Sequence, residues 1–409
     1  MSGCGAEHGL ITVDQALELI LQHTQVLATE RLKLNQALNR YLAEDIYSGI
    51  NLPLFSQSAV DGYALCTQSA IEPESEFQLI GEIRAGQQGE LQLQDSQTVR
   101  IFTGAKIPLG TTTVARQEIV QAIDLSRIKI TEQLKVHADI RDVGEEISVG
   151  QLLANKGQQL SIGAIASLSM AGINTVEVLQ YPKVAVVITG DEVAESIEDF
   201  VAGKIFDANG PLIEAWFQQV GQQVEIFHVA DTQAAVRNLI QELSASHDLI
   251  LTTGGVSVGD YDFIRPVALN LGFEQIFWKV KQKPGKPMFF AQLQRDDSSH
   301  CYLLGLPGNP AAVYVGMQIY TATLLNALQG HKSQPNWFNA VLTHDLKMDA
   351  RERFLRMSAS FEQSVLRVKS LPKQQSHMLS NLMQANCLVR IPAGAVLSEG
   401  QIVHGLFIH

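Results

Sequence analysis

Residues 249–262 read LILTTGGVSVGDYD, an apolar run that ends in a glycine-rich bend with two aspartates, Asp260 and Asp262. A strand, a glycine turn and then a helix form a common anion site, because backbone N–H groups at a helix N-terminus can close on a phosphate. The glycines of the bend permit positive φ angles and a close approach of a ligand to the backbone. The two carboxylates would repel a phosphate unless a cation lay between them. The bend therefore predicts a site for a phosphorylated ligand and a divalent metal.

Polar and acidic residues also follow three other apolar segments. Residues 184–190 (VAVVITG) precede Asp191 and Glu192, residues 224–230 (VEIFHVA) precede Asp231, and residues 301–306 (CYLLGL) precede Pro307, Gly308, Asn309 and Pro310. Any one of these residues could simply cap a helix, a role that Asp and Asn serve well. Four such endings together favour an acidic, glycine-rich rim along one edge of a sheet.

A lysine-rich segment, FWKVKQKPGKP, occupies residues 277–287 in a chain that is otherwise acidic. Its lysines are Lys279, Lys281, Lys283 and Lys286. A run of lysines is usually a solvated surface. Here two prolines stiffen the segment and keep the charges fixed, which favours a shaped anion-binding loop.

Strands and helices alternate regularly through the part of the chain that carries these residues. Helical patterns over 211–220 and 232–246 follow the first two apolar segments, and further helical stretches follow the glycine bend and Pro310. Such alternation predicts a parallel sheet covered by helices, with a ligand crevice at the carboxyl ends of the strands.

Other regions have different patterns. Thr12 and Gln15 form a capping-box arrangement that opens an amphipathic helix. Residues 46–146 contain short segments rich in β-formers, with Gly, Pro and Gln between them, and predict a β-rich domain. From about residue 332 short alternating segments return and predict a small C-terminal β domain.

The composition limits the class of protein. A chain of 409 residues is expected to form two to four domains, and 46% hydrophobic with 18% charged residues is typical of a folded protein. The net charge of −12 argues against a general nucleic-acid or anionic-membrane binder. No uninterrupted apolar run approaches the roughly 18 residues of a membrane span, and the N-terminus shows no signal-peptide pattern. The cysteines, Cys4, Cys66, Cys301 and Cys387, have no metal-site spacing, and we expect reduced thiols in a cytoplasmic protein.

Six motifs together resemble one family. They are SAVDGYA (58–64), RIFTGAKIP (100–108), ITGDE (188–192), TTGGVSVGDYD (252–262), KPGKP (283–287) and LPGNP (306–310). The first two alone could be no more than turns. In this order, over nearly the whole chain, the six resemble the molybdopterin molybdenumtransferase family, which includes the bacterial MoeA proteins and the gephyrin E domain.

The resemblance, with the patterns above, implies a multidomain α/β plus β fold. The expected parts are an N-terminal helix (1–26) that packs on a later domain, a mixed, elongated linker domain (27–45 with 147–180), a β-rich domain (46–146), a central parallel α/β molybdopterin-binding domain (181–330) and a C-terminal β-barrel-like domain (331–409). The family also implies a cytoplasmic homodimer.

The activity that the resemblance implies is insertion of molybdate into adenylylated molybdopterin, with release of AMP and use of Mg²⁺. Implied partners are the molybdopterin adenylyltransferase and molybdoenzyme maturation factors. Two alternatives stay open: an adenylyltransferase-type enzyme, which typically lacks the DGYA and TGAKIP regions, and a non-catalytic, gephyrin-like scaffold.

Site residues carry over only where the motifs match. The implied catalytic residues are Asp61, Glu192, Asp231, Asp262, Lys279 and Lys283, with Asp61 reaching a site across the dimer interface and Asp231 and Asp262 as metal ligands. The implied substrate-binding residues are Ser58, Thr103, Gly104, Thr189, Gly190, Gly254, Gly255, Ser257, Gly259, Lys286, Pro307, Gly308, Asn309, Arg353 and Ser376. Arg351 or Arg356 could stand in for Arg353, and Ser380 for Ser376. Glu145 and Glu146 match a family segment that usually ends in Asp.

Charge suggests how such a site would work. Molybdate and a pyrophosphate are both anions, so cations must offset their repulsion. Lys279 and Lys283 would hold the oxyanion, while the glycine-bend amides and a magnesium ion would hold the pyrophosphate. The residues assign no general base.

Overall fold

The computed structural model describes residues 10–87, 91–194, 203–257, 259 and 262–408. Cys4 and Asp260 lie outside the described residues. The chain forms two compact units. The large unit comprises Met1–Glu30, Asn39–Tyr41 and Val178–His409, and the small unit comprises Arg31–Leu38 and Leu42–Glu177.

A six-stranded sheet organises the first part of the large unit. Its order is β16-β13-β17-β21-β20-β18, with bounds Glu225–Val229, Val184–Thr189, Leu249–Thr253, His300–Leu306, Phe289–Gln294 and Glu274–Trp278. The first four strands are parallel, as the alternating pattern predicts. The last two, β20 and β18, run antiparallel to each other, and β20 is also antiparallel to β21, a feature that the predicted parallel sheet did not include. They flank the lysine-rich segment, and so place it at the edge of the sheet.

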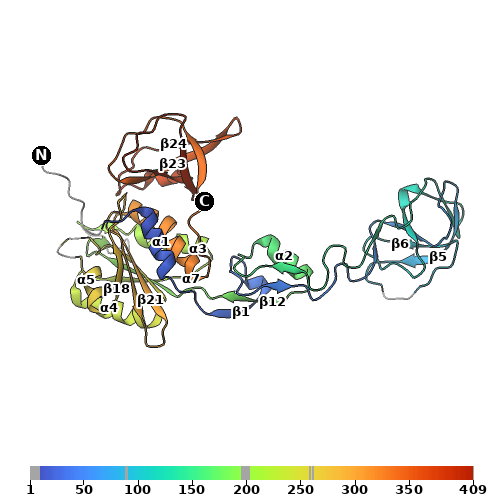
Figure 1. The fold of residues 1–409 in the computed structure, drawn as a ribbon, viewed down its shortest axis with the longest axis horizontal. Coiled ribbons are helices and arrows are strands. Elements are labelled where there is room, and N and C mark those ends of the chain that lie inside the picture. The colour runs from blue at the N-terminus through green and yellow to red at the C-terminus, as the bar shows by residue number, and fades with distance from the viewer. Residues whose placement is uncertain (1–9, 88–90, 195–202, 258, 260–261, 409) are drawn as a thin grey trace. The chain divides into compact units, whose positions relative to one another are not determined.

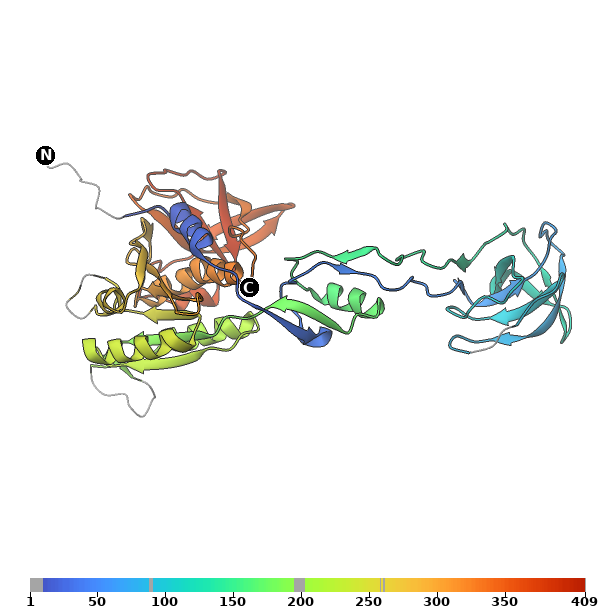
Figure 2. The ribbon, with the colours of Figure 1, turned by 60° about the horizontal axis from the view of Figure 1, so that its bottom comes forward.

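Helices cover both faces of this sheet. They are α1 (Val13–His23), α3 (Asn209–Gln219), α4 (Gln233–Ser246), α5 (Ile264–Asn270), α6 (Pro310–Gly316) and α7 (Ala322–Leu328). Alternate residues of β13 point to opposite faces: Val186 joins a core cluster with α1, α3, α6 and α7, whereas Val187 joins one with α4 and α5. Figure 1 shows α1 beside α7, and Figure 2 shows α4 running along the sheet.

The N-terminal helix α1 is held by its first turn and its apolar face. The predicted capping box is confirmed: the Gln15 N–H donates to Thr12 Oγ1 (3.2 Å), and the Thr12 N–H donates to Gln15 Oε1 (2.9 Å). Val13, Leu17 and Ile20 are fully buried, and burial of each such side chain contributes about 1.5–3 kcal/mol. The helix therefore belongs to the core of the large unit although its residues precede the small unit in the chain.

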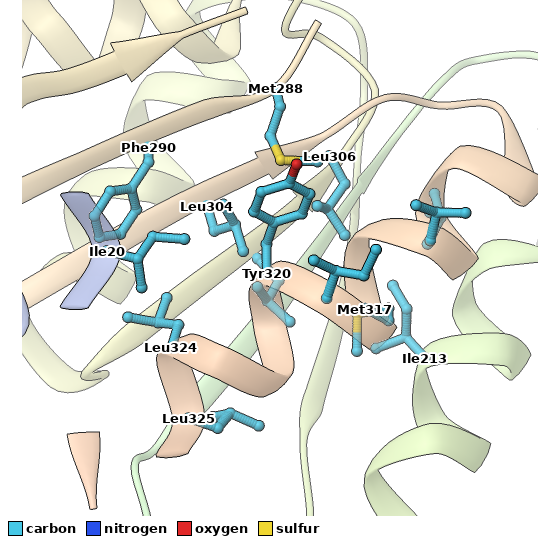
Figure 3. Packing of buried hydrophobic residues seen from close by; sticks show 14 of the residues in the cluster. Ile20, Ile213, Met288, Phe290, Leu304, Leu306, Met317, Tyr320, Leu324 and Leu325 are labelled. Carbon is cyan, nitrogen blue, oxygen red and sulfur yellow. The ribbon is translucent and has the colours of Figure 1, made fainter. Parts of the chain in front are cut away.

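The largest core cluster surrounds Tyr320. In Figure 3 the Tyr320 ring lies at the centre beside Met288 and Leu306, and Ile20 of α1 faces Phe290. The Tyr320 hydroxyl donates to the side chain of Gln282, which satisfies a polar group in an apolar interior. This bond ties the lysine-rich segment to the core.

Tyr320 belongs to a continuous helical segment, Pro310–Leu328, in which a π-helical turn, Met317–Thr321, joins α6 to α7. By length and composition alone this segment could cross a membrane, and it is the single such helix among the described residues. However, 78% of its most apolar window is buried inside the protein, so the apolar side chains serve the core.

The C-terminal part of the large unit is a closed β-barrel, as the barrel-like prediction expected. Five strands close it in the order β23-β24-β22-β26-β25 and back to β23, and β19 pairs with β23 from outside the ring. The bounds are Glu352–Glu362, Val365–Ser370, Phe338–Leu342, Ile402–Phe407, Cys387–Ile391 and, for β19, Gln282–Lys283. The lysine-rich segment is thus joined to the barrel by main-chain pairing.

The small unit is rich in β-structure, as predicted. Its six-stranded sheet has the order β7-β4-β6-β5-β9-β8, with bounds Thr113–Arg116, Gly62–Leu65, Gln97–Ile101, Glu76–Ile83, Arg127–Ile130 and Val120–Ala122. Helix α2 (Ile162–Met170) and the short strands β2 (Ile46–Tyr47), β3 (Gln57–Ser58), β10 (Ile140–Arg141) and β11 (Leu152–Ala154) complete it. The ribbon of β1 (Thr29–Lys33) with β12 (Thr175–Leu179) and the pair β14 (Val193–Ala194) with β15 (Ile205–Phe206) are the remaining strands of the described chain. The 3₁₀ helices are Leu34–Gln36, Gln117–Ile119 and Ser380–Met383.

Candidate functional site

A cleft of about 790 Å³ opens in the large unit where the parallel strands end. Its described lining comprises Thr189, Gly190, Glu192, Val193, Ile205, Phe206, Asp207, Ala208, Asn209, Asp231, Gly254, Gly255, Gly259, Asp262, Gly308, Asn309, Pro310, His377 and Leu379. Ten of the residues predicted from the sequence are in this set, and they come from all four strand ends. The cleft therefore lies at the sheet edge where the alternating pattern predicted a ligand crevice.

The strand ends of β13 and β16 bring two aspartates together. The Asp191 N–H donates to Asp231 Oδ2 (3.3 Å), and the Asp231 N–H donates to Asp191 Oδ1 (3.2 Å). Desolvation raises the pKa of the Asp231 carboxyl, and the negative charges of Asp191 and Glu192 raise it further, against the lowering effect of the Asp191 N–H. Negative charge thus accumulates here with little compensation from the protein.

The glycine bend after β17 forms the floor of the cleft. Gly254 has a φ of +89°, and a Cβ at this position would lie 2.6 Å from Thr189 Oγ1. Its neighbour Gly308, in the turn after β21, would place a Cβ 3.5 Å from the Gly254 Cα atom. Glycine is required at position 254, because its positive φ and the close Thr189 side chain both oppose a Cβ. Asp262 closes the bend, since its Oδ2 accepts the Gly259 N–H (2.6 Å).

Asp207 and Asn209 are functional candidates that the sequence reasoning missed. Asp207 Oδ1 accepts the N–H groups of Asn209 (2.8 Å) and Gly210 (3.0 Å), and so fixes the first turn of α3. The Asn209 side-chain amide donates to the Gly308 carbonyl (2.9 Å), which links two strand-end turns, while its Oδ1 is buried without a partner. The short DANG motif at 207–210 was the available signal, but a helix cap explains it equally well.

A loop of the barrel reaches the cleft and supplies two further missed residues, His377 and Leu379. The Ala311 N–H, in the first turn of α6, donates to the Ser376 carbonyl (3.0 Å). Ser376 therefore lies beside the LPGNP turn through its backbone, whereas Ser380 begins a 3₁₀ helix beyond the loop.

Arg356 holds this loop in place. It is 2% exposed, and its guanidinium donates to the main-chain carbonyls of Lys373 (3.0 Å), Gln375 (3.2 Å) and Met378. Burial lowers the pKa of the guanidinium. Of the three arginines that the sequence left open, Arg356 is the one that organises a segment lining the cleft.

The predicted lysines do not line the cleft. Lys283 forms an ion pair with Asp349 (Nζ–Oδ2 2.9 Å), and Arg353 pairs with Lys283 in the β19–β23 register. The Lys279 ammonium lies 4.2 Å from the centroid of the Trp278 ring. That indole in turn donates to the Val256 carbonyl (2.9 Å) in the glycine bend.

Packing connects the KPGKP segment to the cleft. A Cβ on Gly285 would lie 3.7 Å from the Cβ of Ala312, in the first turn of α6. That turn also receives the barrel loop at Ala311, and Pro310 at its start lines the cleft. Lys286 lies in the same segment, where its carbonyl accepts the Val280 N–H (2.9 Å). Pro307 and Ser257 belong to the turns described above without being part of the lining.

Four predicted residues belong to the small unit: Ser58, Asp61, Thr103 and Gly104. Asp61 Oδ1 accepts both the N–H (2.9 Å) and the hydroxyl (2.7 Å) of Thr103, and these hydrogen bonds lower the pKa of the Asp61 carboxyl. Ser58 is buried, and its hydroxyl donates to the Val60 carbonyl (2.6 Å). Glu145 accepts the Asp142 N–H (2.9 Å).

The acidic residues of the cleft suit a hard cation. Glu192, Asp207, Asp231 and Asp262 all line it, and its described lining includes no lysine or arginine. No group of three His, Cys, Asp or Glu residues among the described part of the chain is arranged to hold a metal by itself. Mg²⁺ commonly needs only one or two carboxylates, because waters and substrate phosphates complete its shell. The donor set therefore fits a magnesium ion that arrives with its ligand.

Comparison with known proteins agrees with this architecture. Residues 11–172 match the MoeA N-terminal region (domain I and II), residues 185–327 a probable molybdopterin binding domain, and residues 339–407 the MoeA C-terminal region (domain IV). Among solved structures, the molybdopterin biosynthesis moeA protein of Pyrococcus horikoshii has the same fold, with a TM-score of 0.80 and 24% identity over 98% of this chain and all of that one.

Two curated relatives carry the name molybdopterin molybdenumtransferase. The protein of Staphylococcus epidermidis is 32% identical and covers 94% of this chain and 92% of its own length. The protein of Haemophilus influenzae is 33% identical and covers 93% of this chain and 94% of its own length. Since three family regions together span most of residues 11–407 and the relatives match along nearly their whole length, the chain belongs to the molybdopterin molybdenumtransferase (MoeA) family.

Proposed function

We propose that this protein inserts molybdenum from molybdate into adenylylated molybdopterin during molybdenum cofactor biosynthesis, releasing AMP. The observation that carries the proposal is the cleft at the strand ends, where Glu192, Asp231 and Asp262 meet two glycine turns. Its glycines leave backbone open to a ligand, as a phosphate-binding turn requires. Its carboxylates repel that same anion, so the proposal includes a cation.

The proposed cation is Mg²⁺, held by Asp231 and Asp262. Burial and two neighbouring carboxylates raise the pKa of Asp231, and a bound cation would offset this unfavourable charge. When bound, the metal would supply electrostatic stabilisation to the phosphate oxygens. Asp262 also keeps the glycine bend closed through Gly259, so its carboxylate links metal binding to the shape of the phosphate site.

Lys279 and Lys283 are the proposed oxyanion ligands. Both come from the segment that packs on the first turn of α6 and pairs with the barrel. This segment therefore lies next to a turn that lines the cleft, although neither lysine is part of the lining. This arrangement keeps the cationic and the acidic halves of the site apart, and each half can then bind the anion or the cation that complements it.

The proposed assembly is a cytoplasmic homodimer in which Asp61 of one copy serves the cleft of another. Asp61 is well suited to contribute a charge, because its pKa is lowered by Thr103 and its carboxylate stays ionised at neutral pH. Cys66, Cys301 and Cys387 are unpaired, as is usual where thiols are kept reduced.

The test is a reconstituted reaction with the purified protein, adenylylated molybdopterin, molybdate and Mg²⁺. We expect AMP to be released only when molybdate is present, and Asp262→Asn to reduce turnover sharply. Asp296→Asn is a matched control, because that exposed aspartate lies in the turn before β21, at the opposite end of the sheet. AMP release that does not depend on molybdate would refute the proposed activity and favour simple hydrolysis of the adenylylated substrate.

A further inference from the structure

The ammonium of Lys283, a proposed oxyanion ligand, already has an anionic partner within the protein. Asp349 Oδ2 lies 2.9 Å from Lys283 Nζ. An oxyanion that binds this lysine must therefore compete with the Asp349 carboxylate, which the fold holds permanently beside it.

The geometry fixes the carboxylate and leaves the lysine mobile. Asp349 Oδ1 accepts the Arg351 N–H (3.0 Å), and the Asp349 carbonyl accepts the Gly394 N–H (2.8 Å). The Asp349 side chain is 20% exposed, whereas that of Lys283 is 53% exposed on a long, flexible stem. The lysine can therefore leave its partner, but Asp349 cannot follow it.

The neighbouring carboxylate, that of Glu352, already pairs with another residue. In the β19–β23 register Gln282 lies opposite Glu352 and Lys283 lies opposite Arg353. Glu352 accepts from the guanidinium of Arg390, which leaves Asp349 as the acid that pairs with Lys283 among the described ion pairs. Arg351 and the Lys283 ion pair keep the pKa of the Asp349 carboxyl below its usual value, so it competes as an anion at neutral pH.

We propose that Asp349 is a resident counter-anion that an oxyanion substrate must displace from Lys283, and that it thereby lowers the affinity of this lysine for anions. The inference rests on the proposed oxyanion role of Lys283. At equal distance a dianion attracts an ammonium about twice as strongly as a monoanion does. The Asp349 carboxylate repels the dianion in the same ratio, so it weakens anion binding at this lysine without favouring one charge over the other.

The effect should be modest, because the pair is exposed to solvent. Exposed ion pairs of this kind correspond to an equilibrium factor of about 1.4 to 5. Removal of the Asp349 charge should therefore tighten molybdate binding by up to about fivefold.

Calorimetric titration of the full-length protein with molybdate alone tests this inference through a double-mutant cycle. We expect Asp349→Asn, whose amide can still accept the Arg351 N–H, to lower the Kd for molybdate by up to about fivefold. The same change in a Lys283→Gln background should have no effect. Asp345→Asn is the control, since Asp345 is a nearby barrel carboxylate that accepts the Glu399 N–H (2.9 Å) and contacts no lysine in the described ion pairs. Asp349→Ser removes the charge in a second way and guards against a local effect of the amide.

The outcomes separate this inference from the function on which it rests. If Lys283→Gln weakens molybdate binding but neither Asp349 variant tightens it, the counter-anion is refuted and the role of Lys283 stands. An equal gain in Asp345→Asn, or a gain that persists with Gln at position 283, would also overturn it, because the effect would then be one of overall charge. If Lys283→Gln leaves the Kd unchanged, the proposed oxyanion role of the lysine fails and the inference fails with it.

Discussion

Replacement of Arg356 should open the barrel loop over the cleft while the barrel itself stays folded. In Arg356→Met, three main-chain carbonyls, those of Lys373, Gln375 and Met378, lose a charged donor. At about 1.5 kcal/mol for each bond to a charged group, the loss sums to roughly 4–5 kcal/mol. A segment that can open into water avoids most of this cost, since its carbonyls are then solvated. The expected result is therefore local opening.

Hydrogen exchange measures that opening directly. Loss of as little as about 1.4 kcal/mol of local stability speeds amide exchange roughly tenfold. We expect at least this increase over residues 371–379 and at the Ala311 amide, which donates to Ser376. Molybdate-dependent turnover should fall because His377 and Leu379 leave the cleft lining.

Two further variants serve as controls for this prediction. Arg356→Lys keeps the charge but lacks the planar fork whose two terminal nitrogens reach the separate carbonyls, so its exchange rates should be intermediate. Arg367→Met removes an arginine that pairs with Glu362 in the same barrel, and it should leave the loop protected. If Arg356→Met lost activity with no change in loop exchange, the reasoning would be refuted, and the guanidinium would have to act on the ligand itself.

Three other outcomes are expected. Gly254→Ala should abolish turnover and lower the melting temperature. The φ of residue 254 is +89°, and a Cβ there would lie 2.6 Å from Thr189 Oγ1, so the backbone and the neighbouring side chain both oppose a larger residue. A variant that is active and stable would contradict this. Trp278→Phe keeps a ring under Lys279 but loses the donor to Val256, so it should impair ligand binding less than Trp278→Leu in a titration. Because the pKa of Asp231 is raised, this carboxyl should become protonated, and activity should fall, at a higher pH than for an ordinary carboxyl. A pH profile of activity that is unchanged in Asp231→Asn would exclude Asp231 from the site.

The sequence predicted the elements of the α/β region and the strand ends at which the cleft forms. Continuous apolar strands such as 184–189, each followed by glycine or an acid, leave few alternatives once helices alternate with them. The sequence did not predict the antiparallel pair β18 and β20. Their polar residues and the lysines between them have the composition of a solvated loop and not of strands at the edge of a sheet. The ion pair of Lys283 could not be predicted either, because no local sequence pattern connects Lys283 with Asp349, 66 residues later.

The first turn of α6 explains how the proposed site, which is assembled from distant segments, could act as one. Pro310 lines the cleft, Ala311 bonds the barrel loop, and Ala312 packs against Gly285 of the lysine segment. Larger side chains at Ala311 or Ala312 would separate these three partners, since both residues are almost fully buried. Because the turn is continuous with the core helix that holds Tyr320, and Tyr320 in turn bonds Gln282, a shift of the lysine segment must disturb the core. The cationic segment and the acidic cleft are therefore rigidly coupled through α6, and the freedom that ligand exchange requires is left to side chains such as Lys283 and to the barrel loop that Arg356 retains.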